Sequence, residues 1–244
     1  MRRGTQAIAC IALAACGRLR FDPLGPAAGD DAMTGDGGGT GDGTTSTADC
    51  SQQPNALVCD GFEPGSPVVW TPVTGNGTVD FSPEQVHSGT QALRAEGISG
   101  RTVAFVSTPI PNVASGEIHL RGFFYRPASA AAVDLDLARV GDGISNSEFF
   151  GIANGSDPGV DPGAGVTSQP PALVPDTWIC VELHVANNTV ALAIDGVQRV
   201  TGALDAFGPY AQVAFGITRD AGTPDQYLVF VDDIVAATAP IGCN

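Results

Sequence analysis

Short apolar segments alternate with turn residues along the chain from residue 50 to its end. The segments are rich in valine, isoleucine, threonine and aromatic residues, and glycine, proline, asparagine or aspartate separates them. None shows a helical apolar period, and strands that recur at spacings of about ten residues are typical of a β-sandwich or barrel. We therefore expect an all-β fold with two packed antiparallel sheets. The predicted strands are residues 68–73, 78–82, 90–95, 102–108, 117–126, 132–139, 148–153, 178–185, 189–194, 212–218 and 226–236.

Two further stretches predict a turn and a loop. Residues 191–200 contain Asp195-Gly196 between apolar positions, which predicts a hairpin with a two-residue turn. This turn alone explains Asp195, because aspartate and glycine tolerate the left-handed backbone that such turns need. Residues 155–175 are rich in glycine and proline and have no strand character, so we expect a long loop there.

The first sixteen residues predict export. Arg2-Arg3 is followed by an apolar run over residues 7–15 that is too short to span a bilayer and ends in small residues, as in a secretory signal peptide. Leu13-Ala-Ala-Cys16 also resembles the lipobox of bacterial lipoproteins. That resemblance implies a signal peptide over residues 1–15, acylation of Cys16, and a lipid anchor at the outer membrane or cell surface. An ordinary signal peptide is the alternative.

Composition separates a spacer from a domain. Residues 16–49 consist mostly of glycine, aspartate and threonine with almost nothing apolar to bury, so we expect a disordered spacer before a domain over residues 50–244. From Cys16 onward the chain has nine arginines, no lysine and 26 acidic residues, which gives a formal charge of 9 − 26 = −17. This charge repels phosphate backbones and anionic lipids. It argues against a nucleic-acid partner and leaves acyl chains as the membrane anchor.

Four cysteines remain after the predicted lipidation site. An even number in an exported protein predicts two disulfides, although four cysteines allow three pairings. We favour Cys50–Cys59, which closes a short loop at the start of the domain, and Cys180–Cys243, which attaches the C-terminus to a central strand. A zinc site is the alternative, but no two of these cysteines have the two-residue spacing that such sites favour.

Three parts of the domain carry a resemblance to a known family. They are Cys59-Asp-Gly-Phe-Glu-Pro-Gly with His87-Ser-Gly-Thr-Gln-Ala-Leu-Arg, residues 178–185 with 190–197, and the end of the chain from Phe230-Val-Asp-Asp-Ile-Val to Cys243. Together they resemble the concanavalin A-like lectin/glucanase superfamily, which includes laminin-G-like jelly rolls and polysaccharide lyases with the same sandwich. The first and third parts also resemble carbohydrate-binding modules of the galactose-binding-like jelly roll. Either resemblance implies a jelly-roll sandwich that binds glycans or matrix.

Alternation along three predicted strands places polar side chains on one face of each strand. The family resemblance implies that such a face binds glycans, because carboxylates and amides hydrogen-bond sugar hydroxyls. The alternative is the ordinary solvated face of an antiparallel sheet. The candidate ligand-binding residues are Glu182 and His184 in 178–185, His119 and Arg121 in 117–125, and Asp134 and Asp136 in 133–137.

Enzymatic activity has little support in the sequence. Glucanases of this superfamily carry Glu-x-Asp-x-x-Glu on one strand, whereas the nearest match here, Asp134-Leu-Asp136, has neither glutamate. A lyase needs a base beside a cation that neutralises the uronate, and Arg121 with a nearby histidine or tyrosine is a possible pair. A degenerate lyase or hydrolase and a purely structural, protein-binding envelope lipoprotein are therefore the alternatives to glycan binding, and no catalytic residue is assigned.

A structural Ca²⁺ is the cofactor that the carboxylates suggest. The resemblance to jelly rolls implies that such an ion can bind where the first and last strands run together. Asp60 and Glu63 near the start of the domain, and Asp233 with Asp232 near its end, offer the hard oxygen ligands that Ca²⁺ prefers. Under the alternative interpretation, Asp233 caps a turn and Asp60 is merely exposed.

Overall fold

The structure is a computed structural model that describes most of the domain from Cys50 onward. The predicted signal peptide (1–15), Cys16 and the predicted spacer (16–49) lie outside the described residues. Within the described part, no helix has the length and apolar character needed to cross a membrane. The described residues are 50–98, 100–113, 117–130, 134–142, 147–153, 157–161, 167–186, 188–203, 209–219 and 226–243.

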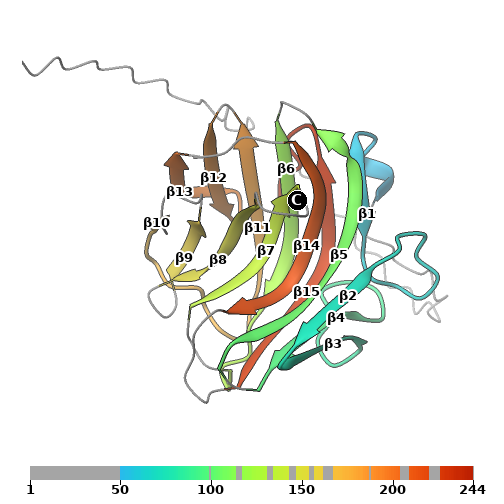
Figure 1. The fold of residues 1–244 in the computed structure, drawn as a ribbon, viewed down its shortest axis with the longest axis vertical. Helices are drawn as coiled ribbons and strands as arrows, with labels where there is room; N and C mark the ends of the chain where they lie inside the picture. Colours follow the sequence, from blue (N-terminus) through green and yellow to red (C-terminus); the bar gives the residue numbers. More distant parts are fainter. Residues whose placement is uncertain are drawn as a thin grey trace, which may run out of the picture. The chain divides into compact units, whose positions relative to one another are not determined.

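Two antiparallel sheets form the domain, as predicted (Figure 1). A single-turn 3₁₀ helix, η1 (Cys50–Gln52), precedes the first strand. Sheet A contains, in spatial order, β13 (Val197–Ala203), β12 (Thr189–Ile194), β11 (Trp178–Ala186), β6 (Ile118–Tyr125), β15 (Tyr227–Ala237), β4 (Ala92–Gly97) and β3 (Gly77–Ser82), with β1 (Ala56–Asp60) also paired to β15. Sheet B contains β10 (Thr167–Ser168), β9 (Asp157–Asp161), β8 (Ser147–Ala153), β7 (Leu135–Gly141), β14 (Tyr210–Arg219), β5 (Thr102–Val113) and β2 (Thr71–Gly75).

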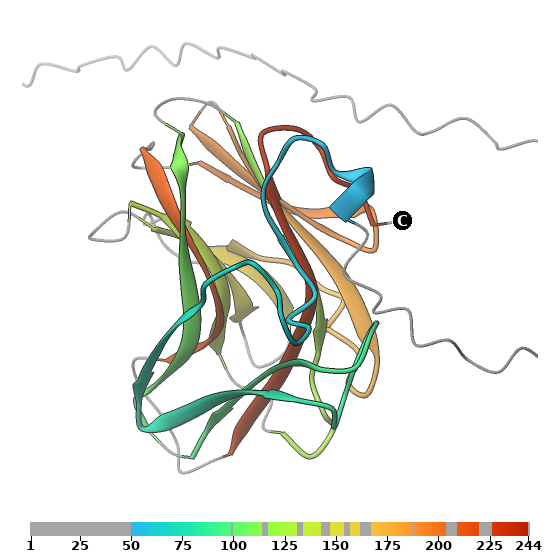
Figure 2. The same ribbon diagram turned by 90° about the vertical axis from the view of Figure 1, so that its right-hand side faces the viewer.

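The core lies between the two sheets. Figure 2 shows β14 and β5 of sheet B on one side and β15 of sheet A on the other. Alternate residues of the central strands point inward, and Phe124 of sheet A lies 6.5 Å from Phe215 of sheet B between ring centroids. Leu183 and Val231 are likewise fully buried. Burying each such side chain stabilises the fold by roughly 1.5–3 kcal/mol, so apolar alternation is what holds the sheets together.

The strand predictions are confirmed for the eleven segments with apolar character, with shifts of a few residues at their ends. The expected loop over 155–175 is wrong in part, because β9 and β10 lie within it. β10 is the edge strand of sheet B, and β9 lies between it and β8. Both are short and rich in turn-forming residues, so backbone pairing with a neighbour is what makes them strands. The predicted hairpin is confirmed, with positive φ angles of 49° at Asp195 and 74° at Gly196 in its turn.

Both predicted disulfides are present. Cys50–Cys59 and Cys180–Cys243 join residues with Cα–Cα distances of 5.7 and 5.8 Å. The first closes a loop with a sequence separation of nine residues, and the second closes one of 63. The second disulfide holds the C-terminal segment against β11, in the interior of sheet A.

Removing the disulfides one at a time should destabilise the protein unequally. Loop-closure entropy predicts a loss of about 4 kcal/mol for the double change Cys180→Ala with Cys243→Ala, and about 2.5 kcal/mol for Cys50→Ala with Cys59→Ala. Urea denaturation of each variant beside the wild type measures the difference. A larger loss from the shorter loop would contradict this order.

Candidate functional site

The outer face of sheet A brings together four of the six predicted ligand-binding residues. Strands β6 and β11 are neighbours, and their register pairs His184 with His119 and Glu182 with Arg121. Two segments reach this face from elsewhere in the chain. One is the loop between β3 and β4 (residues 83–91), and the other is the C-terminal segment (residues 238–243).

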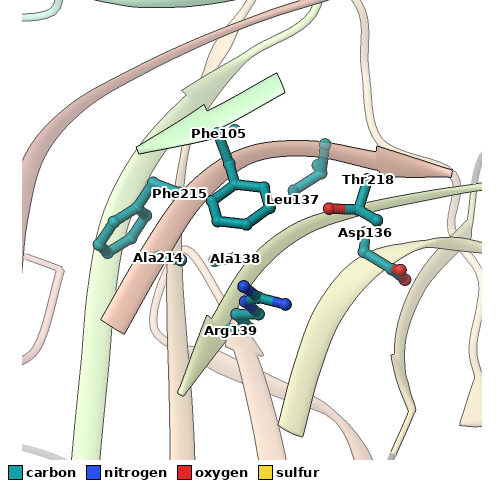
Figure 3. Close-up of a pocket in the computed structure, with 9 residues that line it drawn as sticks. Phe105, Asp136, Leu137, Ala138, Arg139, Ala214, Phe215 and Thr218 are labelled. Carbon is teal, nitrogen blue, oxygen red and sulfur yellow. The ribbon is translucent and has the colours of Figure 1, made fainter. Parts of the chain in front are cut away.

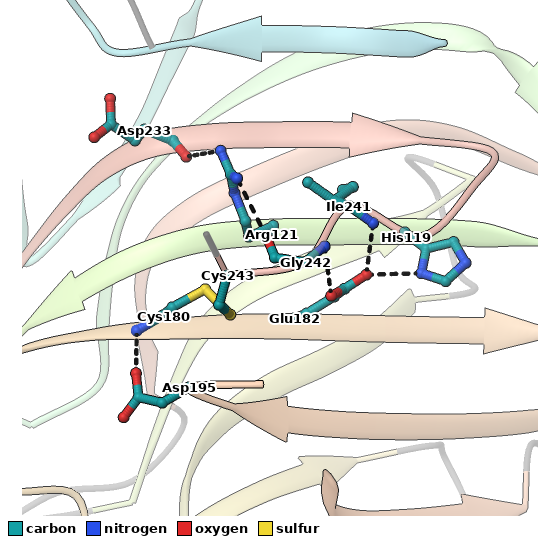
Figure 4. The surroundings of a disulfide bond; sticks show 9 residues. All are labelled: His119, Arg121, Cys180, Glu182, Asp195, Asp233, Ile241, Gly242 and Cys243. Carbon is teal, nitrogen blue, oxygen red and sulfur yellow. Dashed lines mark hydrogen bonds and ion pairs between the residues drawn. A yellow bond between two sulfur atoms is a disulfide. The ribbon is translucent and has the colours of Figure 1, made fainter. Parts of the chain in front are cut away.

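Glu182 binds the C-terminal segment. Its two carboxylate oxygens accept hydrogen bonds from the backbone N–H groups of Ile241 and Gly242, both at 3.1 Å, and one oxygen also lies 3.0 Å from Nδ1 of His119 (Figure 4). Burial by itself would raise the pKa of Glu182. The hydrogen bonds from His119 and the two amides outweigh it and hold this pKa below the ordinary value.

Arg121 binds the same segment from the other side. Its guanidinium donates to the carbonyl oxygens of Gly242 and Asp233, each at 3.4 Å (Figure 4). The side chain is buried, and burial lowers its pKa while the carboxylates of Asp233 and Glu182 act in the opposite direction. Glu182 and Arg121 therefore fix the C-terminal segment beside the Cys180–Cys243 disulfide, and neither side chain faces open solvent.

The two histidines lie beside this segment. His119 is only 1% exposed, and its ring stacks on that of His184 with 4.2 Å between centroids and an interplanar angle of 6°. Glu117 Oε1 lies 2.8 Å from Nε2 of His119 and 3.0 Å from Nε2 of His184. Hydrogen bonding to His119, partly offset by burial, lowers the pKa of Glu117.

Asp134 and Asp136 lie away from the other four predicted residues. Asp136 is in β7 of sheet B, and Asp134 directly precedes that strand, so the six residues do not form one groove. Figure 3 shows Asp136 beside Arg139, whose guanidinium stacks on the Phe105 ring at 4.3 Å from the centroid. The hollow at this place has a volume of about 10 Å³, enough for about one water molecule.

The predicted calcium ligands already accept hydrogen bonds. Asp60 accepts from the backbone N–H of Phe62 at 2.8 Å and from the indole N–H of Trp70 at 2.6 Å. Glu63 accepts from the backbone and the hydroxyl of Thr90. These bonds organise the segment that follows β1, and Ca²⁺ binding there stays a prediction.

Asp232 and Asp233 hold the β3–β4 loop on sheet A. Asp232 accepts from the backbone N–H groups of His87 and Ser88 at 2.9 and 3.1 Å, and Asp233 accepts from the Ser88 hydroxyl and lies 2.6 Å from Nδ1 of His87. Burial, reinforced by the charge of Asp233, raises the pKa of Asp232 to about 7, although three backbone hydrogen bonds oppose this shift. A β-bulge after Asp232 and a φ of 47° at Asp233 let both side chains reach the loop.

Four aromatic rings form a continuous cluster next to this loop. We call Phe123, Tyr125, Trp178 and His87 the aromatic surface. His87 stacks on Phe123 with centroids 3.7 Å apart, and Trp178 lies 5.6 Å from His87 and 5.5 Å from Tyr125. All four residues are half-buried or exposed. Strand alternation puts Trp178 on the same side of its strand as Glu182, and Phe123 and Tyr125 on the same side of theirs as Arg121. The sequence does not show that these two strands are neighbours or that the loop adds His87.

A second group of aromatic residues lines a pocket near the start of the domain. We call it the entrance pocket, and it has a volume of about 240 Å³. Phe62 stacks on Phe81 with 5.6 Å between centroids, and Trp70 packs against Phe62 at 5.4 Å. The polar groups at its base, Asp60 and Glu63, are the ones already bonded to Trp70 and Thr90. The pocket therefore presents aromatic rings with few free polar partners.

Replacing Glu182 should release the C-terminal segment. The change Glu182→Ala leaves two amides and a buried histidine without their acceptor, and we expect the free energy of unfolding to fall by about 2–4 kcal/mol. Glu84→Ala is the matched control, because Glu84 is exposed and only approaches Arg94 at 3.5 Å, so its removal should cost less than about 0.5 kcal/mol. Equal losses in denaturant titrations of the two variants would contradict the assigned role of Glu182.

Comparison with known proteins defines the fold. No family model matches the chain, and no curated protein matches its sequence. The structure resembles the cellulose induced protein Cip1 with a TM-score of 0.59 and 18% identity, over 77% of this chain and 100% of Cip1. It also resembles a sialidase (TM-score 0.57, 12% identity, 76% of this chain and 19% of the sialidase) and the binding domain of Paraclostridial Mosquitocidal Protein 1 (0.53, 9%, 77% and 50%). At these identities the likeness shows the fold alone, and the domain is a jelly-roll β-sandwich.

Proposed function

We propose that this protein is an exported, lipid-anchored envelope protein whose β-sandwich binds glycans through the aromatic surface. The observation that carries the proposal is the clustering of Tyr125 and Trp178 with His87 and Phe123 on one face of sheet A. Partly exposed rings of this kind stack on the apolar faces of pyranose sugars, and large aromatic side chains supply much of the binding energy at recognition sites.

Polar groups flank these rings. Asp176 is exposed and accepts hydrogen bonds from the Tyr125 hydroxyl at 3.3 Å and from the backbone N–H of Ala128 at 2.8 Å, so it orients the tyrosine and places a carboxylate beside it. Nδ1 of His87 is engaged by Asp233, which leaves Nε2 as the ring atom free to meet a ligand. Rings with adjacent acceptors and donors fit a sugar, which has apolar faces and a rim of hydroxyls.

The fold supports the same function without establishing it. The structures that resemble this one include a cellulose induced protein, a sialidase and the binding domain of a mosquitocidal protein.

The entrance pocket is the weaker candidate for the glycan site because the carboxylates that line it, Asp60 and Glu63, are hydrogen-bonded within the protein.

A lyase function has less support. Its base and its cation would come from His119 and Arg121, but His119 is buried between two carboxylates and Arg121 is bonded to backbone carbonyls. A uronate would have to displace the C-terminal segment to reach Arg121. This geometry favours binding over catalysis on the outer face of sheet A.

The membrane anchor rests on the sequence. The Leu13-Ala-Ala-Cys16 motif supports acylation, and the charge of −17 from Cys16 onward leaves lipid chains as the means of attachment. A flexible spacer of this composition reaches roughly 5–6 Å times the square root of its length, which suits a domain held away from a membrane.

Glycan binding is tested by passing the full chain over a panel of immobilised polysaccharides. We expect selective retention, and a loss of affinity of at least about tenfold in Trp178→Ala and in Tyr125→Ala, because each change removes a stacking ring. Phe81→Ala is the control, since Phe81 is an aromatic residue with 44% exposure in the entrance pocket. If Phe81→Ala abolishes retention and Trp178→Ala does not, the ligand binds elsewhere and the aromatic surface is not the site.

Lipid anchoring is tested by the change Cys16→Ser. Without the acylated thiol, the protein should move from the membrane fraction to the soluble fraction, because the charge of −17 from Cys16 onward disfavours attachment to anionic lipid. Fractionation of cells that express the wild type or the variant measures this shift. Continued membrane association of the variant would contradict the anchor.

A further inference from the structure

Three metal-binding side chains converge on the outer face of sheet A, at the opposite end of β6 from Tyr125. Glu117, His119 and His184 each present one ligand atom, and these atoms all lie within 4.8 Å of one another. The register of the sheet produces this arrangement. Glu117 directly precedes β6, two residues before His119, and His184 is the cross-strand neighbour of His119.

The contacts of His119 with two carboxylates call for a positive charge between its ring and Glu117. Its Nδ1 is 3.0 Å from Glu182 Oε1, which assigns the proton to that nitrogen. In a neutral ring, Nε2 then carries a lone pair, and this lone pair faces Glu117 Oε1 at 2.8 Å. Two acceptors at this distance require either a second proton or a cation between them.

His184 favours the cation. Its Nε2 is buried, lies 3.0 Å from the same Glu117 oxygen, and has no hydrogen-bond partner among the residues that the structure describes. A second proton on His119 would satisfy Glu117 but leave the His184 nitrogen unpaired. A metal ion at this point would satisfy both nitrogens and the carboxylate at once, with the His184 ring tilted out of its stack on His119 so that the two in-plane lone pairs converge.

We propose that Glu117, His119 and His184 form a binding site for a divalent transition-metal ion of the Zn²⁺ class. Two imidazoles and one carboxylate suit Zn²⁺, Cu²⁺ or Ni²⁺, whereas Ca²⁺ and Mg²⁺ prefer oxygen ligands. Glu182 supports the site because a histidine ligand commonly donates its other ring N–H to a carboxylate, which fixes its orientation. None of the predicted calcium ligands belongs to this site.

The exposure of Glu117 lets the site admit an ion. Tetrahedral coordination at about 2.1 Å places ligand atoms about 3.4 Å apart, about half an ångström wider than the two distances to Glu117. The His119 ring is held by Glu182 and the core, but the Glu117 side chain is 46% exposed and can move outward. The coordination positions on the side of Glu117 would then face solvent, as in zinc sites that keep one position for water.

The test is Zn²⁺ binding to the purified, oxidised full chain. We expect one equivalent of Zn²⁺ per chain by dialysis and elemental analysis, and a rise in melting temperature on titration, because the ion binds the folded state. His184→Gln and Glu117→Gln should each weaken Zn²⁺ binding by at least about tenfold. Glu84→Gln is the matched control, since it neutralises an exposed carboxylate outside the site and should leave Zn²⁺ binding intact.

Several outcomes would overturn the proposal. Absence of bound Zn²⁺ in the folded wild type would mean that Glu117, His119 and Glu182 are linked by protons alone. Equal affinity in wild type, His184→Gln and Glu117→Gln would place the ion elsewhere, and displacement of Zn²⁺ by millimolar Ca²⁺ would indicate an oxygen-ligand site. Circular dichroism of each variant shows whether a lost ion reflects a lost fold, and Glu117→Gln is the variant that disturbs the sheet least, because its side chain is 46% exposed.

Discussion

The outer face of sheet A depends on how Glu182 and Arg121 bind the C-terminal segment. A carboxylate and a guanidinium at cross-strand positions would be costly to bury alone, but here each is bonded to the backbone of residues that lie over them. The Cys180–Cys243 disulfide holds the same segment in place covalently. Because of these contacts, the C-terminal segment covers polar side chains that would otherwise face solvent on this sheet.

This cover divides the face into two regions with different chemistry. On one side, the β3–β4 loop is held by Asp232 and Asp233 and adds His87 to the rings of Phe123, Tyr125 and Trp178. On the other side, Glu117, His119 and His184 meet where the histidine rings stack. Both regions rely on β6, because it carries His119 near one end, directly after Glu117, and Phe123 and Tyr125 near the other.

The two disulfides hold different parts of the domain in place. Cys50–Cys59 closes a short loop at the start of the domain beside β1. Asp60 then fixes the segment that follows by accepting hydrogen bonds from Phe62 and Trp70. Cys180–Cys243 acts at the other end of the chain. The first and last strands of the domain, β1 and β15, pair with each other, so both belong to sheet A.

The sequence by itself determined the all-β class, most strands, the Asp195-Gly196 turn and the presence of two disulfides, because these follow from local alternation, turn chemistry and cysteine number. It could not reveal β9 and β10, whose backbones form strands only by pairing with a neighbour. It also could not separate Asp136 from Glu182, because alternation assigns a side chain to a face of its strand and does not say which strands share a sheet. The tertiary structure alone decided that the C-terminal segment covers Glu182 and Arg121, and that a distant loop completes the aromatic surface, since both depend on contacts between residues far apart in the chain.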